Sequence, residues 1–344
     1  MTSLKTFDFS YRQLTIISCL LLFTGASFSI DAKIVFTTDG DIYVMNDDGT
    51  GRRRLTKSTT ETHRYPRWSP DGTKIAFTRY MDKENIQFTS ELFIMNADGT
   101  DPQRLTDNKV ADIDSSWSPN GQRIAYTSVQ NGVYQVYIVE VSTRAVTQLT
   151  GIDDETVSTS PDWSPDGTQI AFERFIPIGG IASKTIYVMS ADGQHQRPIL
   201  PDPLLNGPPT FRFFPRWSTD GQRILFYEDK WFKEGDVVKF FVQQIGGAKK
   251  EITDISNRLG NNLFLAGTSW MENDRAILVS IKIKDKPNAS YDLYRYSFDT
   301  RGLRRLTRDP GDEEWPDWTE GTLLVSVHGK LPTQWAEIKH AYHE

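Results

Sequence analysis

The stretch Trp68-Ser69-Pro70-Asp71-Gly72 decides the fold, because the chain returns to it along most of its length. Its close copies are Trp117-Ser118-Pro119-Asn120-Gly121, Trp163-Ser164-Pro165-Asp166-Gly167 and Trp217-Ser218-Thr219-Asp220-Gly221. With Trp270 and Trp318, six tryptophans recur at intervals of 49, 46, 54, 53 and 48 residues. A period near fifty residues indicates one supersecondary unit that is copied many times.

Each unit predicts four short antiparallel strands. After the Trp68 stretch come three runs rich in β-branched and aromatic residues, at 74–78, 91–96 and 103–106. Pro-Asp-Gly and Ala-Asp-Gly separate them, and these suit tight hairpins because Pro presets φ and Gly accepts positive φ. We name the four strands A (with the tryptophan), B, C and D. Four-stranded units at this period are typical of propeller blades.

The two ends of the chain predict closure. The first runs, 34–37, 42–45 and 54–56, are B, C and D strands with no tryptophan strand before them, whereas Trp318 is an A strand at the end. We therefore expect an all-β, six-bladed propeller of four-stranded antiparallel blades, closed by a blade that the termini share. One surplus strand, 323–326, competes with 34–37. A seven-bladed ring that uses 335–338 stays open, although we expect 333–342 to be a short helix.

The six tryptophans allow two interpretations. They could fill the wedges between neighbouring blades, or they could form a ring that stacks on sugars. Because the tryptophan holds the same strand position in every unit, the sequence favours packing.

The first 29 residues have the pattern of a signal peptide. Lys5 and Arg12 precede the apolar run 14–23, and Ser27-Phe28-Ser29 provides a cleavage site before Ile30. An uncleaved anchor is the alternative, but ten apolar residues are few for a span of about 30 Å. We expect a signal peptide at 1–29, the propeller at 30–330 and a helical tail at 331–344. The mature protein would be periplasmic or secreted, with no membrane span.

Composition narrows the function classes. The net charge is −6, and no basic stripe suggests nucleic-acid binding. Cys19 is the only cysteine and lies in the expected signal peptide, so the mature chain would have no disulfide, thiolate metal site or cysteine nucleophile. We expect a monomer.

The units resemble a known family. The stretch 66–77, which includes Pro66-Arg67-Trp68-Ser69-Pro70-Asp71-Gly72, and the stretch 92–99 that follows it are similar to the repeat of the TolB propeller family. The resemblance covers about 33–327. It implies a six-bladed propeller in the periplasm, and the family's binding of the lipoprotein Pal implies a protein partner. We expect the resemblance to be limited to the propeller. In TolB an α/β domain precedes the propeller, and we expect no counterpart of that domain here.

Strand alternation predicts where a binding site lies. The A–B and C–D turns share one face and are nearly identical between units, whereas the B–C and D–A connections share the other and vary. Variable loops on a rigid scaffold are where binding is usually found. The last residues of the D–A connections should ring the channel mouth. The candidate residues are Glu61, His63, Arg64, Asp112, Asp114, Glu155, Thr156, Arg212, Asp312, Glu313 and Glu314.

We expect this face to bind an envelope protein or peptide. No Gly-x-Ser-x-Gly or His-Glu-x-x-His motif occurs, and only His63 among the histidines is well placed for a mouth. An aromatic group, Phe211, Phe213, Phe214, Trp231 and Phe232, could anchor the partner or pack beneath the 198–215 loop.

The acidic mouth leaves an enzyme as the alternative. A glycoside hydrolase or a cation-dependent lactonase could use a carboxylate pair drawn from Glu61, Asp112, Glu155 and Glu313. We expect no cofactor, although calcium could bind at the mouth if several oxygens converge. A structural spacer without a ligand is a third class.

Overall fold

The computed structural model describes residues 34–81, 89–151, 156–178, 181–201, 208–232 and 235–320. All of them belong to one unit of the chain, Ser29–Leu323. The expected signal peptide, the surplus strand 323–326, the alternative strand 335–338, the C-terminal helix and Glu155 lie outside the described residues. The boundaries of the signal peptide, the propeller and the tail therefore stay predictions.

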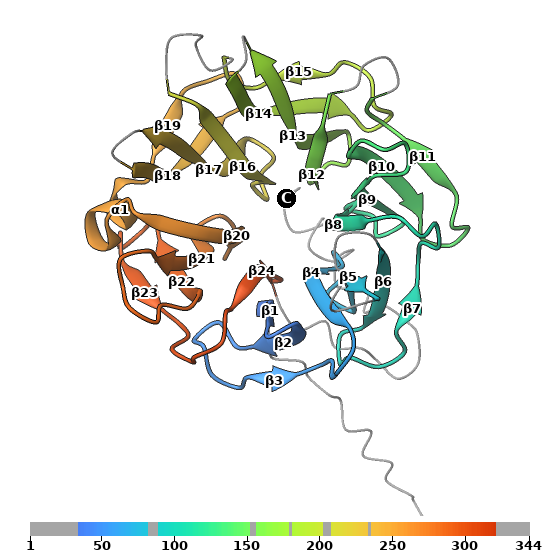
Figure 1. The fold of residues 1–344 in the computed structure, drawn as a ribbon, viewed down its shortest axis with the longest axis horizontal. Helices are drawn as coiled ribbons and strands as arrows, with labels where there is room; N and C mark the ends of the chain where they lie inside the picture. Colours follow the sequence, from blue (N-terminus) through green and yellow to red (C-terminus); the bar gives the residue numbers. More distant parts are fainter. Residues whose placement is uncertain are drawn as a thin grey trace, which may run out of the picture. The chain divides into compact units, whose positions relative to one another are not determined.

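Six sets of four strands repeat one order, and consecutive strands within a set pair antiparallel. In Figure 1 the sets lie around a common centre, with the tryptophan strands β4, β8, β12, β16, β20 and β24 innermost. Set 1 comprises β24 (Glu314–Trp318), β1 (Ile34–Thr38), β2 (Asp41–Met45) and β3 (Arg53–Arg54); set 2 comprises β4 (Thr62–Trp68), β5 (Lys74–Tyr80), β6 (Ser90–Asn96) and β7 (Gln103–Arg104). Set 3 comprises β8 (Asp112–Trp117), β9 (Arg123–Ser128), β10 (Gln135–Glu140) and β11 (Val146–Gln148); set 4 comprises β12 (Ser158–Trp163), β13 (Gln169–Ile178), β14 (Ile181–Ser190) and β15 (Arg197–Pro198). Set 5 comprises β16 (Thr210–Trp217), β17 (Arg223–Phe232), β18 (Gly235–Gln244) and β19 (Lys249–Glu251); set 6 comprises β20 (Leu263–Met271), β21 (Ala276–Ile283), β22 (Asp292–Ser297) and β23 (Leu303–Arg305).

The order A, B, C, D that the sequence predicts is confirmed in these sets. Sets 4 and 5 are also joined by one parallel pairing, Lys184 with Phe211. Set 1 combines strands from the two ends of the described chain, because β24 lies antiparallel to β1 with Trp318 opposite Ile34.

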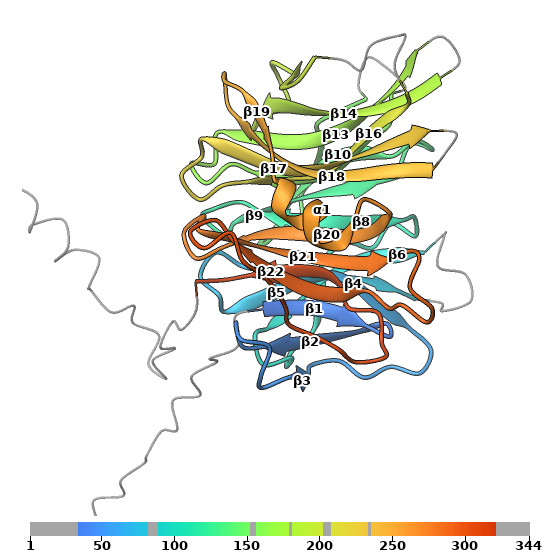
Figure 2. The same ribbon diagram turned by 90° about the vertical axis from the view of Figure 1, so that its left-hand side faces the viewer.

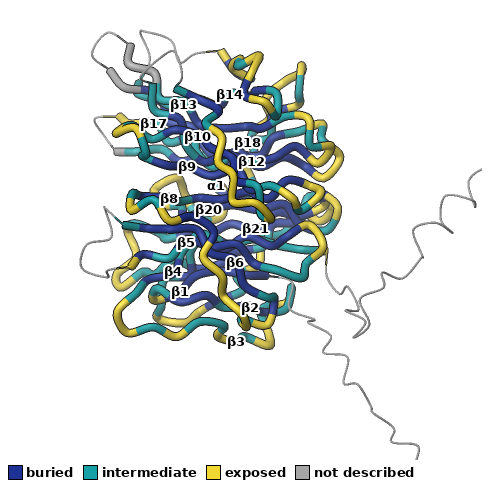
Figure 3. The backbone as a smooth tube through the Cα atoms, turned by 90° about the vertical axis from the view of Figure 1, so that its right-hand side faces the viewer, coloured by how far each residue is buried: buried dark blue, intermediate teal, exposed yellow. Residues whose placement is uncertain are grey.

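The tryptophans pack between neighbouring sets, which lie face to face in Figure 2. Trp68 belongs to one buried cluster with Val35 and Val44 of set 1 and with Ile75 and Phe77 of its own set. Five of the six tryptophans are between 5% and 8% exposed, and only Trp318 is half-buried. Figure 3 shows the same pattern for the backbone, with buried strands and exposed connecting turns. The packing interpretation is confirmed, because a buried indole has no face left for a sugar.

A Leu-Thr pair follows the D strand in sets 1, 2, 3 and 6, and the threonine has a structural role. The Thr56 hydroxyl accepts a hydrogen bond from the Ile42 N–H at 2.9 Å and donates one to Asp41 Oδ1 at 3.0 Å. Thr106 does the same with Leu92 and Glu91, and Thr150 with Val136 and Gln135. In sets 1, 2, 3 and 6 the threonine therefore ties the outermost strand to the start of strand C, where the backbone N–H would otherwise be unsatisfied.

The turns after the tryptophans satisfy their own polar groups. Ser69 Oγ donates to Asp71 Oδ1 at 2.6 Å, and the Thr73 N–H donates to the same oxygen at 3.0 Å. Gly72 lies at φ 67°, a conformation that strains residues with a Cβ. In the C–D turns the carboxylate plays the same part, since Asp48 accepts the Thr50 N–H at 2.9 Å. Their interpretation as hairpins is confirmed.

One element was not predicted. Helix α1 (Thr253–Leu259) lies between sets 5 and 6, where Ile255 is fully buried and Asp254 binds Arg301. Seven residues are too few to show helical periodicity in a sequence. No helix in the described part of the chain is long and apolar enough to cross a membrane.

Candidate functional site

Each innermost strand has a bulge three residues before its tryptophan. The pairing with the next strand shifts register there, for example between Arg64 and Arg67. The bulge residues all have positive φ, between 49° and 111°: Tyr65, Asp114, Ser160, Phe214, Gly267 and Trp315. Bulges redirect side chains and are frequent beside binding sites. The repeat therefore presents six residues of different chemistry from one position of the inner strands.

The bulges bring three of the candidate residues into one neighbourhood. Arg64 lies 5.0 Å from the ring centroid of Trp315, and that ring lies 4.5 Å from the ring of Tyr65. The positive charge of Arg64 also acts on Glu314, although burial dominates and raises the pKa of Glu314 to about 7. The sequence analysis missed both aromatic rings, because their role depends on the bulge.

Asp114 is the third member of this neighbourhood. It is 4% exposed, and burial raises its pKa to about 6, although Arg67 and a hydrogen bond to Ser160 favour the charged form. Asp114 in turn acts on the hydroxyl of Tyr65, whose pKa burial raises well above its ordinary value. We call Arg64, Tyr65, Asp114, Glu314 and Trp315 the mouth cluster.

Four other candidates lie deeper, five residues before the tryptophan of their strand. These are His63, Asp112, Arg212 and Glu313, which are between 0% and 7% exposed and are held by neighbouring groups. Arg212 Nε donates to Glu228 Oε1 at 2.9 Å, and Arg52 Nη1 donates to Glu313 Oε1 at 3.1 Å. Burial lowers the pKa of His63 and raises the pKa of Asp112 to about 6 and that of Glu313 to about 7.

The remaining described candidates lie apart from one another. Glu61 forms an ion pair with Arg79. The carbonyl of Thr156 accepts a hydrogen bond from Gln135 Nε2 at 2.6 Å. Asp312 Oδ1 accepts the Tyr291 N–H at 2.8 Å.

Of the four carboxylates proposed for hydrolysis, the three that the structure describes are each engaged by a different partner. Glu61 is bound to Arg79, Asp112 accepts hydrogen bonds from Ser128 and Asn108, and Glu313 is bound to Arg52. Within the described ranges, no group of three or more His, Cys, Asp or Glu residues is arranged to hold a metal ion. Calcium at the mouth stays a prediction.

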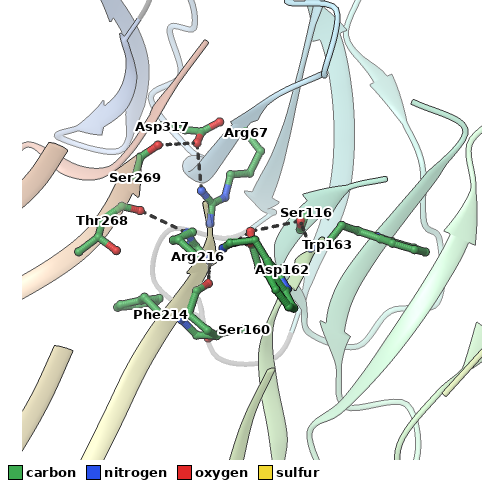
Figure 4. A network of polar contacts seen from close by, with 12 residues as sticks. Arg67, Ser116, Ser160, Asp162, Trp163, Phe214, Arg216, Thr268, Ser269 and Asp317 are labelled. Carbon is green, nitrogen blue, oxygen red and sulfur yellow. Dashed lines mark hydrogen bonds and ion pairs between the residues drawn. The ribbon is translucent and has the colours of Figure 1, made fainter. Parts of the chain in front are cut away.

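A second polar group was missed by the sequence analysis, although it stands immediately before each tryptophan. Around the centre it reads Arg67, Ser116, Asp162, Arg216, Ser269 and Asp317, that is Arg-Ser-Asp twice. We call these six residues the inner ring, and Figure 4 shows how they meet. Aligning the units on their tryptophans would have revealed this order, because a position next to an invariant packing residue faces the same place in every set.

The two aspartates of the inner ring join neighbouring sets. Asp317 accepts hydrogen bonds from the Trp68 N–H at 2.9 Å, Arg67 Nη1 at 3.2 Å and Ser269 Oγ at 3.2 Å. Three sets further around, Asp162 repeats the arrangement. It accepts the Trp217 N–H at 2.8 Å and Ser116 Oγ at 3.4 Å, and it lies 3.8 Å from Arg216 Nη1.

The aromatic group on the loops divides into a packed part and an exposed part. Phe213 is packed against Tyr227, with ring centroids 5.0 Å apart. Trp231 and Phe232, at the end of the β17–β18 hairpin, are 50% and 44% exposed. Trp231 leans on Phe211, with centroids 4.5 Å apart, which gives the exposed ring a fixed support.

Known proteins are similar to this chain in sequence. A family model described as the TolB beta propeller domain matches residues 32–175. A protein TolB homolog of Chlorobium luteolum is 35% identical over 158 residues, which cover 44% of this chain and 33% of the relative. A Tol-Pal system protein TolB of Francisella tularensis is 37% identical over 87 residues, which cover 25% of this chain and 19% of the relative. The matches thus span between a fifth and a third of the length of these relatives.

The fold has solved counterparts. The crystal structure of TolB from Acinetobacter baumannii superposes with a TM-score of 0.67 at 20% identity, covering 84% of this chain and 66% of that one. At this level of identity the likeness concerns the fold.

Proposed function

Because the chain carries the repeat of the TolB beta-propeller family, we propose that its six strand sets are the blades of one closed propeller. The pairing of β24 with β1 supports closure, since it gives set 1 its fourth strand from the far end of the chain. A closed ring leaves only the short outermost strand of each blade as a sheet edge. Such a ring would hold the B–C and D–A connections on one rigid face, which we call the loop face.

We further propose that the protein is an exported, non-catalytic scaffold that binds a protein or peptide partner in the bacterial envelope at its loop face. The observation that carries this proposal is the pair of half-exposed aromatic side chains, Trp231 and Phe232, on the B–C hairpin of set 5. Exposed Trp and Phe on a supported hairpin are typical anchors of protein interfaces. Trp231 Nε1 also donates to Asp229 Oδ2 at 3.2 Å, so the anchor is held before a partner arrives.

The mouth cluster would supply the polar part of the same interface. Arg64 is half-buried and lies over the ring of Trp315, which packs against Tyr65, and its charge acts on the half-buried Glu314. A charged pair at the edge of aromatic rings can select the orientation of a bound segment. The separate engagement of Glu61, Asp112 and Glu313 supports binding over hydrolysis, which needs two convergent carboxylates.

The proposal predicts that the partner is lost when the anchor is removed. A photo-crosslinking amino acid at Phe232 should capture one envelope protein, and Trp231→Ala should weaken its binding by roughly ten-fold or more. Val146 is the matched control position, because it is an apolar side chain that is also 45% exposed but lies on the D strand of set 3. Equal capture from both positions, or unchanged affinity of Trp231→Ala, would contradict the proposed interface.

One observation keeps an enzyme as a second candidate. Burial raises the pKa of the neighbouring Glu313 and Glu314 to about 7, which suits a general acid near neutral pH. A hydrolase of glycosides or lactones would then turn over model substrates, and Glu314→Gln would lower kcat by roughly a hundred-fold or more. Absence of turnover over a panel of both substrate classes would dispose of this candidate.

A further inference from the structure

A cavity lies next to the inner ring, on the side of the turns that follow the tryptophans. Its volume is about 330 Å³, and its charged lining residues are Arg67, Asp162, Arg216, Asp317 and, at the exposed rim, Glu320. Residues of these turns, such as Ser69 and Thr219, line it as well, which sets it at the opposite ends of the inner strands from the loop face.

The aspartates in the lining have their oxygens engaged by the protein itself. Asp317 accepts three hydrogen bonds, and one of them comes from the backbone of Trp68. Asp162 accepts the backbone N–H of Trp217 and the hydroxyl of Ser116. These hydrogen bonds hold both carboxylates in place within the protein.

Arg67 leaves donor capacity, whereas Arg216 Nε and Nη1 already donate to the carbonyls of Thr268 and Pro215. Arg67 is 7% exposed, and its Nη1 binds Asp317, whereas its Nη2 is buried without a hydrogen-bond partner among the described residues. A buried guanidinium nitrogen without an acceptor costs free energy, which a ligand oxygen would recover. Figure 4 shows Arg216 among the residues of the inner ring, at the position equivalent to Arg67 three sets around. Arg216 also lines the same cavity.

We propose that this cavity is a binding site for a carboxylate group, which the planar guanidinium of Arg67 holds with Arg216 opposite it. A guanidinium matches a carboxylate through two parallel N–H donors, and both arginines reach the same small space. The apolar part of the lining consists of Pro70 and four tryptophans, Trp68, Trp217, Trp270 and Trp318. Three of these indoles are buried between sets, so the exposed Pro70 and the half-buried Trp318 would contact the carbon chain of the ligand.

The size of the cavity restricts the ligand. Its volume lies at the low end of the roughly 300–1,000 Å³ that is usual for ligand pockets. A small dicarboxylic acid fits this description, and so does the C-terminal carboxylate of a peptide. Both ligands would present the same carboxylate group to Arg67. They differ in whether that carboxylate belongs to a small acid or to the C-terminus of a peptide.

The test is a titration of the full chain followed by tryptophan fluorescence and calorimetry. The probes are succinate, a tripeptide with a free C-terminal carboxylate, and the same tripeptide as its amide. We expect saturable binding of one or both free acids and none of the amide; binding of the peptide acid alone identifies a chain terminus, and binding of succinate identifies a small acid. Arg67→Gln should weaken binding by roughly ten-fold or more.

Matched variants keep the outcome decisive. Arg197→Gln removes an exposed arginine of β15, outside the cavity, and should leave affinity unchanged. If Arg67→Gln fails to fold by circular dichroism, Glu320→Lys decides, because Glu320 is exposed at the cavity and its reversal should tighten binding about three-fold or more at low salt. Binding of the amide as well as the acid, unchanged affinity in Arg67→Gln or Glu320→Lys, or saturable binding of neither acid would overturn the proposal. None of these results bears on the loop face, so the two proposals fail separately.

Discussion

Replacing Trp270 by alanine is expected to lower the free energy of unfolding by about 3–5 kcal/mol. Its indole is 5% exposed and belongs to the core between sets 5 and 6, with Leu225 and Tyr227 on one side and Ile277 on the other. Its Nε1 also donates to the carbonyl of Arg216 at 2.9 Å, and that carbonyl would lose its partner. Cavity formation and a lost buried hydrogen bond therefore act together.

The measurement is chemical denaturation of the full chain, and the matched control is Trp231→Ala. Trp231 is 50% exposed, so its removal should change the unfolding free energy by only about 0.5 kcal/mol or less. The two variants should thus behave in opposite ways, with Trp270→Ala losing stability and Trp231→Ala losing the partner. Equal stability losses would mean that the tryptophans do not form the packing layer between sets.

The second large effect is a pH dependence that originates at Asp162. Its side chain is 15% exposed, and burial raises its pKa from 3.8 to about 7, although Arg67 and the Trp217 N–H oppose that shift. The folded protein therefore holds this proton to higher pH than the unfolded chain. The contribution to stability is present below about pH 4 and is lost as pH rises through about 7.

Asp162→Asn should remove this loss. The amide cannot ionise, yet its oxygen can still accept the Trp217 N–H, so the variant keeps the junction between sets 4 and 5. One pKa unit corresponds to about 1.4 kcal/mol. Between pH 4 and pH 8 the parent should therefore lose up to about 4 kcal/mol of unfolding free energy relative to Asp162→Asn. Urea denaturation at several pH values measures it.

Asp166 provides the control of opposite sign. It is exposed in the turn after Trp163, and hydrogen bonds from Ser164 and Thr168 lower its pKa. The stabilisation by the Asp166 carboxylate is present above its unfolded pKa and is lost as the pH falls through its lower folded pKa. Asp166→Asn should therefore slightly lower the free energy of unfolding at pH 8. If Asp162→Asn and the parent follow parallel pH curves, Asp162 is not the buried acid that the inner ring requires.

The strands and turns within each unit could be predicted from the sequence. Trp68 and the turn after it predict a strand end, because Ser69 and Asp71 satisfy the polar groups of the turn without help from elsewhere. Thr56 and Thr106 likewise act within their own sets. Such motifs are recognisable because the residues that satisfy each other lie close in the sequence.

The candidate site could be predicted only in part. Arg64, Asp114 and Glu314 were found because they end the D–A connections, but Tyr65 and Trp315 were missed, since a bulge with positive φ is decided by pairing and not by residue type. The burial of Asp112 and Glu313 could not be predicted either, because residues of neighbouring sets, such as Ser90 and Ser280, contact them.

The sequence by itself determined the repeat, the strand order within each unit and the turns between strands, since these depend on hydrophobic period and on contacts between near residues. Only the tertiary structure decided which units meet. Asp317 and Trp68 are hydrogen-bonded across 249 positions, and Asp162 and Trp217 across 55. The chemistry of the inner ring depends on those long-range junctions, where burial changes both the pKa of an acid and the donors left on an arginine.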